Sequence, residues 1–142
     1  PIHSSAASDV YKRQSRESLE SAAERFAAEL LPGILRPGAR EQVQAYRDAG
    51  EEVWLVSASM DLWLAPIARA LGVGLISTKT AWSGGRFVGV DGDNCRGPEK
   101  VRRVKAQLDV DAFQQMVAYG DSSGDREMLE MADEGHFQPF RE

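Results

Sequence analysis

The sequence predicts an α/β protein with a mostly parallel sheet flanked by helices. Apolar runs with strand character alternate with segments whose apolar residues recur at helical spacing. Residues 53–56 (VWLV) are apolar on both faces, which is typical of a parallel strand covered by helices on each side. Gly84 and Gly85 separate two short β-like runs, and this pattern predicts a small hairpin projecting from the sheet.

Length and composition favour one globular domain. The chain has 142 residues, of which 42% are hydrophobic and 27% charged, with a net charge of −5. This acidic balance disfavours a nucleic-acid partner. No apolar run approaches the roughly 20 residues of a transmembrane span, so we expect a cytoplasmic protein. Cys95 is the single cysteine and cannot form an internal disulfide. Oligomeric state is not determined by these features.

The first half of the chain predicts two helices and then the first half of a βαβ unit. Apolar residues at three- and four-residue steps predict a helix over residues 15–31, which the segment PGILRPG ends. A second helix over 39–49 ends at Gly50, a typical C-cap residue. After the strand at 53–56, a short polar turn leads into a third helix over about 61–71.

The second half of the chain continues the alternation. Residues 72–78 (GVGLIST) read as the returning parallel strand, and residues 80–90 form the hairpin. The remaining elements are a helix opened by Pro98 and running to about Leu108, a strand over 115–121, a helix over 125–133 and a short strand over 136–140.

Ligands of such sheets bind beyond the C-terminal ends of the strands, and Ser57 follows the first strand directly. Its hydroxyl, together with turn amides of Ala58 and Ser59 at the start of a helix, could bind a phosphate oxygen. The alternative is a simple N-cap, a role that Ser59 before Asp61 could also fill.

Lys100, in the segment GPEK, lies in the first turn of a predicted helix. A cation is unfavourable near a helix N-terminus, so this lysine either extends into solvent or meets an anion. The solvated alternative is the ordinary one for an isolated surface lysine.

Asp121 and Asp125, in VAYGDSSGD, give the strongest signal. Two carboxylates at this spacing after a buried strand can enter one crevice, where they repel unless a cation or hydrogen-bond donors are present. Mg²⁺, a hard ion with oxygen ligands, would satisfy them. The alternative is that Asp121 only caps the following helix. A hydroxyl, a lysine and paired carboxylates at successive strand exits together predict a site for a phosphate and its metal.

The segments VWLVSAS, GPEK and AYGDSSGDREML resemble the second, third and fourth motifs of the haloacid dehalogenase (HAD) superfamily of phosphatases. The segments GGRFVGVDGDNCRGPEK and ADEGHFQPF are similar to the phosphoserine phosphatase-like branch (subfamily IB), including bacterial relatives of the C-type phosphatidylglycerophosphatase. The resemblance covers about residue 15 to the end and implies a HAD-like Rossmannoid fold.

The resemblance also implies a role for each matching residue. Ser57 and the amide of Ala58 would hold the transferring phosphoryl group, and Lys100 would neutralise its charge. Asp121 would bind Mg²⁺, and Asp125 would orient Lys100 or a metal-bound water. Enzymes of this family attack phosphorus with an aspartate and pass through an aspartyl-phosphate.

Two departures affect the expected substrate. Phosphoserine phosphatases typically have Asn before the last Asp and two glycines after the hydroxyl motif, whereas this chain has Gly124 and Ala58-Ser59. A lipid or small-molecule phosphomonoester is therefore at least as good an expectation as phosphoserine.

The first family motif, Asp-x-Asp at the end of the first strand, has no match in this chain. Asp109 follows a helical segment and lies after the lysine motif, and Asp91 belongs to the exit of the hairpin. Both read as loop carboxylates, so no nucleophile is assigned. We expect the chain to be an inactive fragment of a phosphatase, and the alternative is a phosphate-binding or regulatory module without catalysis.

Residues 4–14 (SSAASDVYKRQ) match one reading frame of a transposase adapter used to prepare sequencing libraries. We therefore expect residues 1–14 to be a non-native tail, with a genuine disordered tail as the alternative. Residues 15–36 are interpreted as the remnant of a helical cap and residues 37–142 as a partial core domain. The central first strand would then be missing, and we expect poor stability or aggregation.

Overall fold

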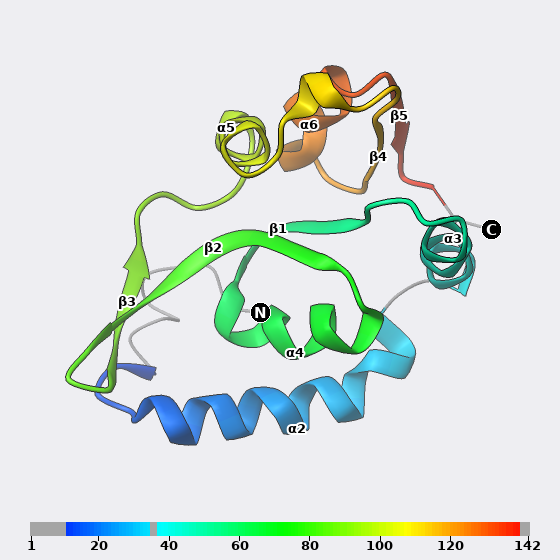
Figure 1. Ribbon diagram of the computed structural model, residues 1–142. Coiled ribbons are helices and arrows are strands. Elements are labelled where there is room, and N and C mark those ends of the chain that lie inside the picture. Colours follow the sequence, from blue (N-terminus) through cyan, green and yellow to red (C-terminus); the bar gives the residue numbers. More distant parts are fainter. Residues whose placement is uncertain (1–10, 35–36, 140–142) are drawn as a thin grey trace.

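The computed structural model describes residues 11–34 and 37–139. Helices α2 and α4 lie in two layers on one side of strands β1 and β2, and α5 lies on the other side (Figure 1). The elements in chain order are α2 (Arg16–Ile34), α3 (Pro37–Asp48), β1 (Trp54–Met60), α4 (Asp61–Leu71), β2 (Gly74–Ser83), β3 (Arg86–Asp91), α5 (Pro98–Gln107), the 3₁₀ turn η2 (Val110–Ala112), β4 (Val117–Gly120), the 3₁₀ turn η3 (Ser123–Asp125), α6 (Arg126–Met131) and β5 (Glu134–Phe137).

The strands form two sheets rather than the single sheet predicted. Strand β1 pairs in parallel with β2, which pairs in antiparallel fashion with β3 through the predicted hairpin. Strands β4 and β5 form a separate parallel pair. The α/β class and the hairpin are thus confirmed. Within the described residues, β1 is hydrogen-bonded on one side only and is an edge strand.

Both faces of β1 are nevertheless covered, as its apolar sequence predicts. Leu55 packs against the cluster of Ala27, Leu64 and Ile67, which joins α2 and α4. Trp54 and Val56 point the other way and pack against the cluster that contains Val104 of α5. A strand with apolar residues on both faces therefore has helices on both faces.

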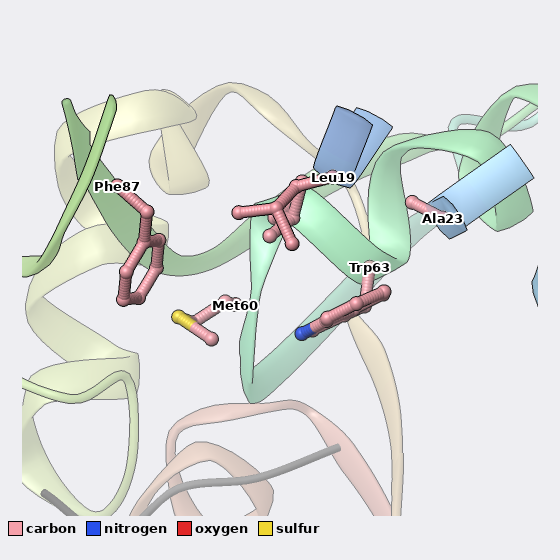
Figure 2. Packing of buried hydrophobic residues seen from close by; sticks show 6 residues of the cluster. Leu19, Ala23, Met60, Trp63 and Phe87 are labelled. Carbon is pink, nitrogen blue, oxygen red and sulfur yellow. The ribbon is translucent and has the colours of Figure 1, made fainter. Parts of the chain in front are cut away.

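A third apolar cluster holds the hairpin to the helices (Figure 2). Phe87 of β3 is 0% exposed and packs with Met60 and Trp63, while Leu19 and Ala23 come from α2. The ring of Phe87 also meets Trp82 edge-on, with centroids 6.0 Å apart. This cluster fixes the hairpin against α2 and α4.

The boundaries of several elements differ from the sequence prediction. Helix α2 continues through Pro32 to Ile34, because Leu31 in its last turns packs against the Ala27 cluster and tertiary contact outweighs the local breaker. Helix α3 begins at Pro37, where proline's missing N–H costs nothing. Strand β2 runs unbroken from the parallel pair into the hairpin.

The last residues of the predicted N-terminal tail contact the hairpin. The ring of Tyr11 lies 5.4 Å from that of Trp63, and Arg13 and Gln14 exchange backbone hydrogen bonds of 3.0 and 2.9 Å with Phe87. The first ten residues of that tail lie outside the described part of the chain, as does Phe140 of the predicted last strand. None of the described helices is long and apolar enough to cross a membrane.

Candidate active site

Lys100 and Asp125 form a buried ion pair between β1 and the loop that follows β4. Lys100 is 6% exposed and Asp125 is 8% exposed, and the Lys100 Nζ donates a hydrogen bond to Asp125 Oδ1. The same ammonium donates to the carbonyl oxygen of Val56 at 3.3 Å. The alternative of a solvated Lys100 is therefore wrong. Its side chain connects α5, β1 and the loop that follows β4.

The second oxygen of Asp125 is held by its own loop. Asp125 Oδ2 accepts backbone N–H bonds from Asp121 at 2.8 Å and from Ser122 at 3.1 Å. Gly120 makes this turn possible, because a Cβ at that position would lie 2.6 Å from the Cβ of Asp125. The carboxylate therefore has a fixed orientation toward Lys100.

Arg103 holds the helix that carries Lys100, a role that sequence reasoning missed. Its Nε donates to Glu99 at 2.8 Å, and its Nη1 donates to the carbonyl of Ser77 within β2 at 2.7 Å. A third donor reaches the carbonyl of Asp93. The Arg103 guanidinium also lowers the pKa of Glu99. The signal was present as a Glu99–Arg103 pair at i,i+4 spacing.

Ser57 and Ala58 lie one and two residues beyond Val56, but inside β1 rather than in a turn. Ser57 Oγ accepts the N–H of Ser59 at 3.1 Å. Helix α4 begins at Asp61 with Met60 as N-cap, and no side chain caps it. The expected helix N-terminus at Ser57–Ser59 and the N-cap alternatives for both serines are therefore wrong. No described hydrogen bond joins Ser57 or Ala58 to the Lys100–Asp125 pair.

Asp121 is exposed at the exit of β4. The capping box that follows uses Ser122 and Asp125, so the alternative that Asp121 caps the helix is wrong. In the described part of the chain, no group of three His, Cys, Asp or Glu side chains could hold a metal ion. Because the Asp125 carboxylate is engaged with Lys100, the described residues do not make up a complete Mg²⁺ site.

The Asp125 carboxyl makes the stability of the fold dependent on pH. Burial raises its pKa, but hydrogen bonds from Lys100 and from the N–H groups of Asp121 and Ser122 outweigh burial and lower the pKa below 3.8. The folded state thus binds this proton less readily than the unfolded state. The resulting stabilisation is present above about pH 4 and is lost as the pH falls through the lower folded pKa.

We therefore expect the free energy of unfolding to fall more steeply below about pH 4 in the wild type than in Asp125→Asn. Urea denaturation at a series of pH values measures both slopes. Equal slopes would show that Asp125 has the same proton affinity in the folded and unfolded states.

Comparison with known proteins shows the family of this chain. The family model for haloacid dehalogenase-like hydrolases matches residues 3–130. Protein CicA of Caulobacter vibrioides is 43% identical over 126 residues, which are 87% of this chain and 56% of that protein. Phosphoserine phosphatase SerB1 of Mycobacterium tuberculosis is 32% identical over 107 residues, covering 72% of this chain and 35% of that protein.

A solved structure shares the fold. The crystal structure of a protein of unknown function from Bordetella pertussis Tohama I superimposes with a TM-score of 0.78 at 29% identity, over 86% of this chain and 58% of that one. The chain spans roughly half or less of the length of the curated relatives above. The chain is phosphatase-like and related in sequence to phosphoserine phosphatases. The matched residues include Lys100, Asp121 and Asp125, and the chain belongs to the haloacid dehalogenase-like hydrolase family.

Proposed function

We propose that this chain carries part of the active site of a Mg²⁺-dependent phosphomonoesterase that works through an aspartyl-phosphate. The buried Lys100–Asp125 pair, which joins β1 to the loop that follows β4, is the observation that supports this proposal. A buried ammonium oriented by a carboxylate suits a reaction whose barrier is lowered by positioning and charge neutralisation.

Lys100 would bind the phosphoryl group. An ammonium has three N–H donors. Lys100 uses two of them, one to Asp125 and one to the Val56 carbonyl. The third N–H donor would bind a phosphoryl oxygen beside Ser57. The Ser57 hydroxyl and the Ala58 amide would then complete the contacts to the phosphate. Asp125 acts as a positioning residue because it fixes the direction of the ammonium.

Asp121 would be one ligand of the Mg²⁺, which supplies charge neutralisation when it is bound. An aspartate outside residues 1–142, on a strand between β1 and β4, would act both as the nucleophile and as a second protein ligand of the Mg²⁺. The separation of β1 and β4 into two sheets supports this placement. In this proposal residues 1–14 are a non-native tail, 15–36 a cap remnant and 37–142 a partial core domain.

The upstream coding sequence tests the proposal directly. An in-frame strand that ends in Asp-x-Asp supports the phosphatase, and a stop codon or an unrelated reading frame contradicts it. The latter result would favour the second candidate function, a phosphate-binding or regulatory module without catalysis.

The extended protein then gives a kinetic test. We expect Asp121→Asn and Lys100→Met each to lower Mg²⁺-dependent hydrolysis of an aryl phosphate by about 100-fold or more, because each removes a charge that stabilises the transition state. Asp109→Asn is the matched control, since this exposed carboxylate lies outside the site. Unchanged turnover in Asp121→Asn would remove that residue from the metal site.

A further inference from the structure

Strand β1 contains a bulge directly after Ser57. Ser57 pairs with Ser77 of β2, and the next pair along the two strands joins Met60 to Thr78. Strand β1 therefore advances three residues while β2 advances one, so β1 carries two extra residues at this point. A bulge bends its strand and changes the direction of the groups that it carries.

The two extra residues, Ala58 and Ser59, lie in the proposed phosphate site. The Ala58 amide and the Ser57 hydroxyl are the two phosphate contacts that β1 would provide. Inside the bulge, the Ser59 N–H donates to Ser57 Oγ at 3.1 Å. The shape of the bulge therefore decides where both of these phosphate contacts lie.

Asp61 fixes the chain directly after the bulge. Its Oδ1 accepts the backbone N–H of Thr80 at 3.0 Å and the Thr80 hydroxyl at 2.6 Å. Asp61 follows Met60 in the chain, and Thr80 belongs to β2, the middle strand of its sheet. Thr80 is itself held by pairing with Val90 of β3. Two hydrogen bonds from a well-supported strand therefore hold the end of the bulge in place.

A role at the start of helix α4 does not account for these two bonds. A carboxylate in the first turn of a helix is favourable, but among the described residues no amide of α4 donates to Asp61. Both donors come from Thr80 and both are neutral. The contact therefore needs an acceptor oxygen rather than a negative charge, and the side-chain amide of asparagine also has such an oxygen.

We propose that Asp61 is a positioning residue for phosphate binding, because its carboxylate holds the bulge in the shape that directs the Ser57 hydroxyl and the Ala58 amide to the phosphate. This inference rests on the proposed function, which assigns those two contacts to the phosphoryl group. Asp61 acts through the bulge and does not contact the phosphate. A bulge that is held before the ligand arrives loses less conformational entropy on binding.

The test measures binding of inorganic phosphate to the 142-residue chain. Two-dimensional NMR of the amide groups follows the resonances of Ala58 and Ser59 during a phosphate titration. Their shifts give the dissociation constant at the bulge itself, which a change of stability elsewhere in the fold does not move.

Four variants separate the positioning role from other effects. Asp61→Ala removes the acceptor, Asp61→Asn keeps an acceptor oxygen without the charge, and Thr80→Val removes the hydroxyl donor but keeps the backbone donor. Ile67→Val is the matched control for stability. Ile67 lies on the same helix as Asp61 and is 2% exposed, in an apolar cluster that contains no residue of the bulge.

We expect Asp61→Ala to weaken phosphate binding by about fivefold to tenfold, because the two phosphate contacts are then no longer held together. Thr80→Val should weaken it by about threefold to fivefold, and Asp61→Asn and Ile67→Val by less than about twofold. The Ser59 amide, which bonds inside the bulge, should also exchange its hydrogen faster in Asp61→Ala than in the wild type.

Equal phosphate affinity in the wild type and Asp61→Ala would overturn the inference and leave the proposed phosphate site standing. An equal loss in Asp61→Asn or in Ile67→Val would also overturn it, because charge or general stability would then explain the effect. If Asp61→Ala does not fold, Thr80→Val decides, and unchanged affinity in that variant contradicts the inference. If phosphate moves neither resonance in the wild type, the phosphate site is absent from this chain and both proposals fail.

Discussion

Replacing Asp125 with alanine is expected to lower the free energy of unfolding by about 3–5 kcal/mol. The change leaves the ammonium of Lys100, which is 6% exposed, without its anionic partner. It also removes the acceptor for the backbone N–H groups of Asp121 and Ser122. A buried charge without a partner is costly, and the loss of its partner is worth far more than the loss of a surface ion pair.

Urea denaturation of Asp125→Ala, Lys100→Met and the double variant measures this effect. We expect the double variant to be more stable than the sum of the two single losses predicts, by about 2 kcal/mol or more, because it no longer buries an unpaired charge. Asp109→Ala is the control for removal of an exposed carboxylate. Additive losses, or a loss below about 1 kcal/mol in Asp125→Ala, would contradict the buried pair.

Replacing Phe87 with alanine is expected to cost about 3–5 kcal/mol of the free energy of unfolding. Phe87 is 0% exposed, and its ring lies beside Met60 in the cluster that links β3 to α2 and α4 (Figure 2). Truncation leaves a cavity and removes ring contacts with Tyr11 and Trp82. The hairpin would then lose its main apolar attachment to the helices.

The next residue provides a matched control on the same strand. Val88 is 49% exposed, so Val88→Ala should change the free energy of unfolding by less than about 0.5 kcal/mol. Hydrogen exchange adds a local measure, because the amides of Arg13 and Phe87 bond across this segment and should exchange faster in Phe87→Ala. Equal stability losses in the two variants would show that the cluster does not depend on Phe87.

Local patterns were sufficient to predict several elements of the fold. The apolar run Val53–Val56 predicted a strand covered on both faces, and the hairpin followed from Gly84 and Gly85. The position of Lys100 in a first helical turn left two alternatives, solvent or an anion, and in the structure its ammonium meets Asp125. These signals are readable because each depends on residues within a few positions of one another.

Other features escaped prediction because they depend on contacts between distant segments. Helix α2 passes its proline because Leu31 packs against α4, and β1 extends through Ser57, where a turn was expected. Arg103 bonds to a carbonyl 26 positions away, and a backbone hydrogen bond joins Gly97 to Gly124 in another loop. No periodicity in the sequence reports such contacts.

The sequence by itself determined the α/β class, the hairpin and the order of hydroxyl, lysine and carboxylates along the chain. Only the tertiary structure decided that Lys100 pairs with Asp125 rather than with solvent, that Asp125 is therefore not a free metal ligand, and that β1 and β4 lie in separate sheets. The physical reason is that burial and hydrogen-bond geometry depend on how the elements pack, whereas residue type and spacing determine only which groups reach the strand ends.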